Sequence, residues 1–194
     1  VVGENAAIIA TGMQANVFII DKSEARLNQL KSQFGERITT LLSEDIKLED
    51  YVTNCDLLIG GVLIPGANAP KLVSKEMIKN MKRGSVIVDV AIDQGGCVET
   101  SKPTTHANPT YTVDDVVHYC VANMPGGVPM TSTLALNVAT LPFVLKLAKD
   151  GYKDALASDA NFLAGLNVCQ GNVTYKAVAD DLGLEFVDPS RAIN

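Results

Sequence analysis

The sequence predicts an α/β fold in which a doubly wound parallel sheet is followed by a C-terminal helical segment. Short apolar runs alternate with helical segments of about ten residues, a spacing typical of βαβ units. Several of these runs are continuously apolar, as strands are when helices cover both faces of a parallel sheet. Beyond residue 128 the strand pattern gives way to helical segments.

Residues 5–93 show the clearest alternation of helix and strand. Ser23 precedes the second helix and is a favoured N-cap residue, because its side-chain oxygen can accept a hydrogen bond from a backbone N–H group. Leu27, Leu30 and Phe34 then recur at helical spacing, which predicts one buried helix face. In chain order, helices are expected at 5–15, 24–34, 45–53 and 74–82, and strands at 16–21, 38–42, 56–63 and 85–93.

The pattern changes after residue 94. Gly95-Gly96 and the segment 102–105 indicate a loop that leaves the sheet. The apolar run VVHYCV at 116–121 indicates one more strand.

A segment rich in Pro and Gly then predicts a rigid connection to a long helix. Thr131 or Ser132 is expected to cap this helix at its start. Pro142 should kink the helix, and Gly151 should end it. The residues at 153–183 predict two or three short helices without a sheet pattern.

Composition argues against several classes of function. The chain of 194 residues has a net charge of −6 and scattered basic residues, whereas nucleic-acid binding depends on concentrated positive charge. No apolar run has the roughly 18 residues of a membrane span, and no basic, apolar leader indicates secretion. The four cysteines lack C-x-x-C pairs, and His106 and His118 stand apart. We therefore expect free thiols in a reducing cytoplasm and no metal site.

The start of the chain resembles the end of a dinucleotide-binding fingerprint. Val1-Val2-Gly3 leads directly into a helix and matches the close of G-x-G-x-x-G, whose strand and first two glycines would lie upstream. Asp21 ends the next strand about 20 residues further on, where an acid binds the ribose hydroxyls. An ordinary helix start and an ordinary strand-ending aspartate are the alternative. We expect a Rossmann-type sheet without its first strand over 1–127, with NAD preferred because a carboxylate repels a 2′-phosphate.

Three long segments resemble alanine dehydrogenase almost residue for residue. They are GGVLIPGANAPKLVS at 60–74, GSVIVDVAIDQGGCVETSKPTTH at 84–106 and HYCVANMPGGVPMTSTLALNVATLP at 118–142, and a looser match continues through 162–184. The family joins alanine dehydrogenases with pyridine nucleotide transhydrogenases. The resemblance implies NAD-dependent, reversible oxidative deamination of L-alanine to pyruvate and ammonia by a hexamer. It also implies that 128–194 is the C-terminal helical part of the substrate domain.

The resemblance further implies a set of cofactor-binding positions. Gly3 would lie at the pyrophosphate turn and Asp21 at the ribose, with Arg26 and Ser43 flanking the adenosine. The positions around the nicotinamide follow strand ends, where an open α/β sheet binds its ligand. They are Val62, Leu63, Val90, Ala91, Ile92, Asp93, Val121, Ala122, Asn123 and Met124.

Asp93 is the residue expected to take part in the chemistry. It follows a buried strand and precedes Gln94-Gly95-Gly96, so its carboxylate should lie at the mouth of the crevice. In the resembled family this acid works with a histidine of the other lobe to move a proton at the attacking water. An aspartate that caps loop amides is the alternative. Asn123 is equally consistent with a turn role, whereas Asp89 is expected to orient loop amides and His118 to be a buried strand residue.

Three other functions remain open. The NAD-binding domain of a proton-translocating transhydrogenase shares much of the pattern, although the acid in VDVAIDQGG and the following PTTH favour alanine dehydrogenase. A fragment that binds NAD without catalysis is a second alternative, and a scaffolding or regulatory protein is a third. Because the arginine, lysine and histidine of the substrate lobe would lie upstream, the chain by itself is expected to be inactive. Without a central strand it is also expected to fold poorly or to associate through the exposed gap in its sheet.

Overall fold

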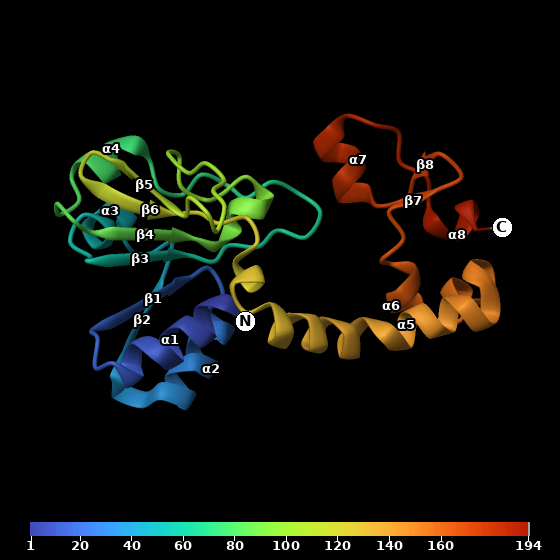
Figure 1. The fold of residues 1–194 in the computed structure, drawn as a ribbon, viewed down its shortest axis with the longest axis horizontal. Helices are drawn as coiled ribbons and strands as arrows, with labels where there is room; N and C mark the ends of the chain where they lie inside the picture. Colours follow the sequence, from blue (N-terminus) through green and yellow to red (C-terminus); the bar gives the residue numbers. More distant parts are fainter. Residues whose placement is uncertain (194) are drawn as a thin grey trace. The chain divides into compact units, whose positions relative to one another are not determined.

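The computed structural model describes residues 1–193, which form two compact units (Figure 1). The first unit contains Val1–Leu63 and Ala69–Ala122. The second contains Ile64–Asn68 and the residues from Asn123 onward. The first unit holds the predicted parallel strands, and the second is mainly helical.

The first unit is a mixed α/β structure, which confirms the predicted fold class. Its strands pair in the orders β1-β2 and β3-β4-β6-β5, and every pair is parallel except β5 with β6. The elements are α1 (Val2–Gly12), β1 (Val17–Asp21), α2 (Glu24–Phe34), η1 (Gly35–Arg37), β2 (Ile38–Leu42), α3 (Leu48–Val52), β3 (Leu57–Gly60), α4 (Lys75–Lys79), β4 (Val86–Asp89), η2 (Val90–Gln94), β5 (Thr110–Val113) and β6 (Val116–Tyr119).

The strands form two sheets in place of the single interrupted sheet that the sequence predicts. Among the described strands, β1 is paired on one side by β2, and β3 is paired on one side by β4. In a doubly wound sheet, strands in the positions of β1 and β3 lie on either side of the central strand, with β2 and β4 next to them. Without a strand between them, two separate sheets are the expected outcome.

The strand predicted at 85–93 is shorter than expected. β4 ends at Asp89, and Val90–Gln94 form the 3₁₀ turn η2. Gly95 adopts a left-handed conformation, with φ of 86°, and its N–H donates to the carbonyl of Ile92. The apolar run continues through this turn because Ala91 and Ile92 still face the core, so hydrophobicity alone could not indicate where the strand ends.

The hairpin of β5 and β6 was missed by the sequence analysis, which expected only the second of these strands. The two strands are joined by Asp114 and Asp115, whose φ angles are 48° and 62°. A two-residue loop with both φ angles positive is the tight turn that matches the twist of a β-hairpin. Aspartate tolerates this conformation better than most residues do.

Packing of α2 follows its sequence pattern. Leu27, Leu30 and Phe34 are all buried, which confirms the predicted face, and the last two pack with Ala7 of α1. The Oγ atom of Ser23 accepts a hydrogen bond from the backbone N–H of Arg26 at 3.3 Å, which confirms the predicted N-cap.

A larger core surrounds the second sheet. Ile78 of α4, Ile87 of β4 and Val116 of β6 are completely buried in this core. Ser74 caps α4 by accepting a hydrogen bond from Met77 N at 3.3 Å. The cap of α4 and the continuous apolar cluster therefore stabilise the sheet that contains β3 and β4.

Substitution Gly60→Ala at the end of β3 is expected to destabilise the first unit by about 1–3 kcal/mol, as overpacking of a core does. A Cβ at this position would lie 2.4 Å from the Sγ atom of Cys97 and 3.1 Å from a carboxylate oxygen of Asp89. The midpoint of urea unfolding of the intact protein measures the effect. Gly12→Ala is the control, because no described atom lies within 4 Å of its added Cβ. Equal midpoints for the two variants would contradict the prediction.

The second unit begins with the 3₁₀ turn η3 (Met124–Gly127) and the long helix α5 (Pro129–Ala157). The predicted cap at Thr131 or Ser132 is wrong, because the helix begins at Pro129 and the Oγ atom of Ser132 donates to the carbonyl of Pro125. Proline is favoured in the first turn of a helix, where its missing N–H costs nothing. Gly151, with φ of 73° and ψ of 161°, breaks α5 into two helices, which confirms that the long helix ends there. Pro142 lies within helical backbone, so the kink expected at this proline is found at Gly151 alone among the described residues of α5.

The rest of the second unit contains α6 (Ala160–Leu163), α7 (Lys176–Leu182) and α8 (Pro189–Ala192). It also contains a small antiparallel pair, β7 (Val168–Cys169) with β8 (Asn172–Val173). The expectation of no sheet in this region is therefore wrong. The pair is closed by Gln170 and Gly171, both at positive φ, and each strand is too short to show an alternating pattern.

Apolar side chains cover much of the surface of α5. By length and composition the helix is apolar enough to cross a membrane, and no part of its most apolar stretch is buried in the described structure. One such helix is weak evidence for a membrane span, since the core helix of a soluble protein has the same length and composition. Apolar surface of this extent normally contacts a partner.

Candidate functional site

Three elements of the first unit meet at the carboxyl end of β3. A Cβ built on Gly61 would lie 3.2 Å from Cγ1 of Val2 and 3.8 Å from the amide nitrogen of Gly3. The first turn of α1 therefore lies against the end of β3. In the parallel register, Gly60 of β3 is opposite Asp89 of β4, so β4 ends at the same edge.

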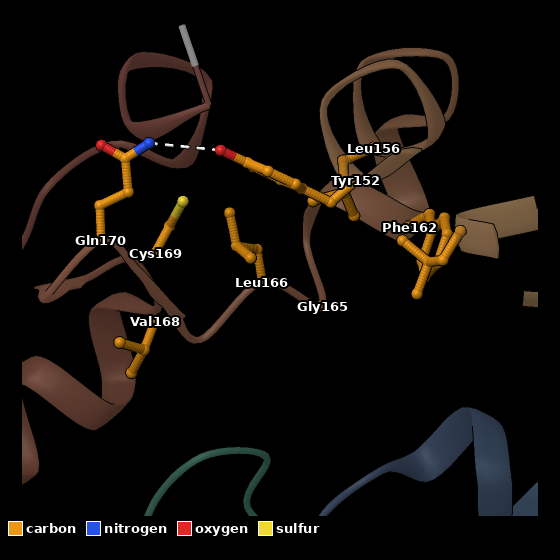
Figure 2. Close-up of a pocket in the computed structure, with 9 residues that line it drawn as sticks. Tyr152, Leu156, Phe162, Gly165, Leu166, Val168, Cys169 and Gln170 are labelled. Carbon is orange, nitrogen blue, oxygen red and sulfur yellow. Dashed lines mark hydrogen bonds between the residues drawn. The ribbon is translucent and has the colours of Figure 1, made fainter. Parts of the chain in front are cut away.

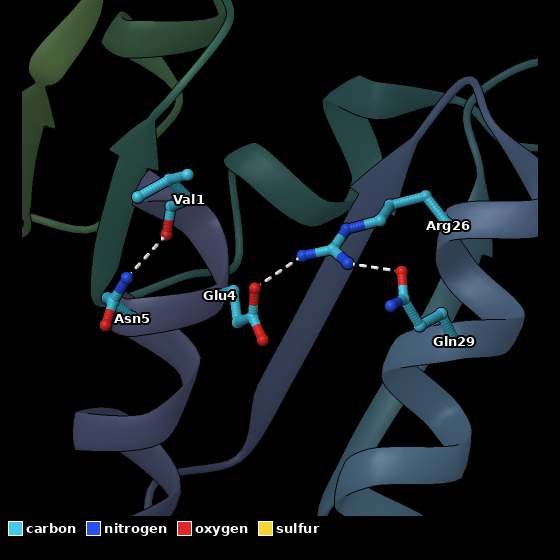
Figure 3. A network of polar contacts seen from close by, with 5 residues as sticks. All are labelled: Val1, Glu4, Asn5, Arg26 and Gln29. Atoms are coloured by element: carbon cyan, nitrogen blue, oxygen red, sulfur yellow. Dashed lines mark hydrogen bonds and ion pairs between the residues drawn. The ribbon is translucent and has the colours of Figure 1, made fainter.

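The turn from β1 to α2 reaches the same helix start (Figure 3). Asp21 is the last residue of β1, and its Oδ1 atom accepts a hydrogen bond from Ser23 N at 2.8 Å. Arg26 of α2 forms an ion pair with Glu4 of α1, with 2.6 Å between Nη2 and Oε2. The ends of β1 and β3 thus both adjoin the first turn of α1, the arrangement in which open α/β sheets bind ligands.

The first turn of α1 has the properties of an anion site for a dinucleotide. The first N–H groups of an α-helix have no partner within the helix and attract negative groups. No described atom lies within 4 Å of a Cβ built on Gly3, so a ligand can approach the backbone closely there. Asp21 is half-buried, and no described residue donates a hydrogen bond to its Oδ2 atom. That oxygen is suited to accept from ribose hydroxyls.

The residues predicted to surround the nicotinamide differ in exposure. Leu63 is exposed and Val62 is partly buried, while Ser43, predicted at the adenosine end, is exposed just beyond β2. Ala91 and Ile92 are buried in the core, so their side chains are not available to a ligand.

Val90 is half-buried at the start of η2, and Asp93 is exposed within the same turn. Asp93 follows β4 by four residues and therefore lies on the edge that also carries the end of β3.

The predicted residues that follow β6 are divided between the two units. Val121 and Ala122 belong to the first unit, where Val121 is buried. Asn123 and Met124 belong to the second unit. The Oδ1 atom of Asn123 accepts a hydrogen bond from Gly126 N at 3.2 Å, which is the turn role that the sequence left open.

The loop after Asp93 is held by a buried carboxylate. Asp89 is completely buried, and its Oδ2 atom accepts hydrogen bonds from Val98 N at 3.1 Å and from Ser101 Oγ at 2.6 Å. This confirms the expectation that Asp89 orients loop amides. The Cys97 thiol also donates to Asp89, and burial together with this carboxylate raises the pKa of Cys97 to about 12.

Lys71 holds the same loop from its other side and was not identified from the sequence. Its Nζ atom donates to the carbonyl oxygens of Gly95 at 2.5 Å, Gly96 at 2.8 Å and Val98 at 3.4 Å. In the sequence Lys71 is one of several lysines at 71–82, and nothing in that pattern distinguishes it from the others. Only the fold shows that three carbonyl groups converge on it.

His118 is a buried residue of β6 and packs among its neighbours in the first unit. It is completely buried, stacks on Tyr111 and lies 2.8 Å from the hydroxyl of Thr100, which confirms the prediction of a buried strand histidine. Burial lowers its pKa, so the neutral ring is favoured. The four cysteines are free, and three of them are buried.

The second unit contains an apolar hollow of about 560 Å³ (Figure 2). Its lining includes Phe162, Leu166 and Tyr152, whose hydroxyl accepts a hydrogen bond from Gln170 Nε2 at 3.2 Å. No carboxylate, histidine or cation is among the residues that line it, so it lacks the groups that proton or hydride chemistry requires.

Sequence and structure comparisons identify relatives of this chain. A family model described as alanine dehydrogenase/PNT, C-terminal domain, matches residues 1–176. The chain is 58% identical to an alanine dehydrogenase of Halomonas elongata and 56% identical to one of Bacillus subtilis; all of the chain is matched, and 52% and 51% of those proteins. It therefore spans about half the length of these curated relatives.

Among solved structures, an alanine dehydrogenase and a transhydrogenase are similar to this chain, the first more than the second. An L-alanine dehydrogenase matches with a TM-score of 0.81 at 50% identity, over 94% of this chain and 50% of that one. A transhydrogenase from Sinorhizobium meliloti matches with a TM-score of 0.58 at 28% identity, over 68% of this chain and 37% of that one.

Proposed function

This chain belongs to the alanine dehydrogenase/PNT C-terminal domain family, and we propose that its first unit binds NAD for the reversible oxidative deamination of L-alanine to pyruvate and ammonia. The observation that carries the proposal is identity of 56–58% to alanine dehydrogenases over the whole chain. The edge at which β1, β3 and β4 end beside the first turn of α1 supports it, because a dinucleotide binds at such an edge.

The residues present at this edge fit the dinucleotide. Gly3 leaves the start of α1 open for the pyrophosphate, and the Oδ2 atom of Asp21 can accept from the ribose hydroxyls. Arg26 and Ser43 flank the adenosine. Leu63 and Val90, with Ala91-Ile92, border the nicotinamide, and Val62, Val121 and Ala122 complete the proposed contacts within the first unit.

Asp93 supplies the proton chemistry in this proposal. Its carboxylate is exposed in η2, so it can exchange protons with a water or substrate group, whereas Asp89 is buried and already accepts three hydrogen bonds. When bound, NAD supplies the hydride acceptor. Lys71 and Asp89 position the turn by holding the loop that follows Asp93.

An assay of the intact protein that contains these residues tests the function. Incubation with L-alanine and NAD is expected to produce NADH, pyruvate and ammonia in equal amounts. NADH binding without alanine-dependent turnover would favour the transhydrogenase-like or non-catalytic alternatives. Sedimentation of the same protein tests the predicted hexamer, and fractionation of cells tests its cytoplasmic location.

Substitution Asp21→Ala is expected to weaken NADH binding by about 10- to 100-fold, because hydrogen bonds to a charged group contribute about 1.5–3 kcal/mol. Isothermal titration with NADH measures the change. Asp56→Ala is the matched control, since Asp56 precedes β3 at the opposite edge and forms an exposed ion pair with Lys82. The assignment of Asp21 is contradicted if both variants bind NADH as tightly as the parent protein.

A further inference from the structure

Arg26 is held by two side chains close to the proposed ribose site (Figure 3). Its Nη2 atom lies 2.6 Å from Oε2 of Glu4, and its Nη1 atom donates to Oε1 of Gln29 at 2.5 Å. The side chains of Arg26 and Glu4 are 32% and 29% exposed, less than those of the other ion pairs in the described structure. The hydrogen bond from Arg26 lowers the pKa of Glu4, so this carboxylate is charged at neutral pH.

Arg26 lies where a cation can recognise a 2′-phosphate. It follows Asp21 by five residues, and Ser23 links the two: Ser23 N donates to Asp21, and Arg26 N donates to Ser23 Oγ. An arginine near the ribose-binding acid is the group that accommodates the 2′-phosphate of NADP. Its planar guanidinium group binds phosphate through two adjacent N–H groups.

The turn therefore carries two opposing groups. Asp21 repels a 2′-phosphate, whereas an available Arg26 would attract one. Each terminal nitrogen of the guanidinium group already donates to the side chain of Glu4 or Gln29, and the carboxylate of Glu4 offsets the positive charge of the group. A phosphate that approached Arg26 would have to displace the carboxylate of Glu4 or bind beside its negative charge.

We propose that Glu4 is a specificity-determining residue, which withholds Arg26 from a 2′-phosphate and so increases the preference of the site for NAD over NADP. This inference rests on the proposed binding of NAD by the first unit. Glu4 lies in the first turn of α1, where its charge acts on the pyrophosphate of both dinucleotides alike. That part of its effect cancels in the ratio of the two affinities, and the 2′-phosphate remains as the difference.

Dissociation constants of NAD and NADP for the intact protein and its variants test the proposal. Glu4→Gln is expected to lower the ratio of the NADP constant to the NAD constant by about two- to fivefold, the size of one partly exposed charge interaction. Glu4→Ala, which also removes the hydrogen bond, should lower the ratio at least as much. The NAD constant should change less than the NADP constant does.

Two further variants separate the proposed role from a general effect of charge. In Glu4→Gln combined with Arg26→Gln, the ratio should return to at least the parental value, because the cation that was released is now absent. Glu36→Gln removes the same charge from a side chain that is 95% exposed, and should leave the ratio unchanged.

An unchanged ratio in both Glu4 variants overturns the inference while the binding of NAD stands. The inference also fails if the ratio falls equally in Glu36→Gln, or stays low after Arg26 is removed. If the parent protein binds neither dinucleotide, the proposed function itself is wrong, and the inference is wrong with it.

Discussion

Substitution Asp93→Asn in the intact protein is expected to lower kcat for alanine oxidation by about 10²- to 10⁴-fold, the usual contribution of a positioned acid–base group. Asparagine keeps the size of the side chain and its place in η2 but cannot accept and return a proton. NADH affinity should change little, because the proposed ribose and pyrophosphate contacts lie on β1 and α1. Steady-state kinetics and NADH titration measure the two quantities.

The control for this experiment is Asp114→Asn, a similar change in the exposed turn between β5 and β6. Asparagine also tolerates the positive φ of this turn, so the variant should fold and turn over normally. Parental kcat in Asp93→Asn would show that Asp93 only caps its local turn. Loss of NADH binding together with turnover would instead indicate a disturbed fold.

Substitution Asp89→Ala is expected to reduce the free energy of unfolding by about 3 kcal/mol or more, since hydrogen bonds to a buried charged group contribute about 1.5–3 kcal/mol each. The change leaves Val98 N and the hydroxyl of Ser101 without their acceptor in the core. It also leaves a cavity beside Gly96, whose added Cβ would lie 2.7 Å from Oδ2 of Asp89. Urea unfolding of the intact protein measures the loss.

Two comparisons make the Asp89 experiment specific. Ser101→Ala removes one of the partners and should cost about 1.5–3 kcal/mol, the value of one hydrogen bond to a charged group. Asp56→Ala removes an exposed ion pair and should change stability by less than about 1 kcal/mol. If Asp89→Ala is no less stable than Asp56→Ala, the carboxylate does not hold the loop as described.

The elements of α2 could be predicted in detail because their signals are local. Ser23 caps the helix, and Leu27, Leu30 and Phe34 form its buried face, as their spacing requires. The end of β4 could not be found in the same way. Ala91 and Ile92 are as apolar as a strand interior, so their composition does not distinguish the turn, closed by the left-handed backbone at Gly95, from a continuing strand.

In the candidate site, too, residues with local sequence signals could be predicted and contacts between distant segments could not. Gly3, Asp21 and Asp93 could be proposed from the sequence, because each lies next to a helix or strand that the sequence pattern predicts. The carboxyl ends of parallel strands also meet at one edge of the sheet, which places these residues near one another. The partners of Arg26 and Lys71 could not. Arg26 meets Glu4 across 22 residues of sequence, and Lys71 meets the carbonyl groups of Gly95 and Gly96 across 24 and 25.

The sequence by itself determined the α/β class, the N-cap of α2 at Ser23 and the end of β1 at Asp21. Only the tertiary structure decided that Glu4 forms an ion pair with Arg26, that Asp89 and Lys71 hold the loop beyond Asp93, and that β5 pairs with β6. The physical reason is the distance along the chain over which each interaction acts. Capping and hydrophobic periodicity act within one or two helical turns, whereas an ion pair or a buried carboxylate depends on chain segments that come together only when the sheet forms.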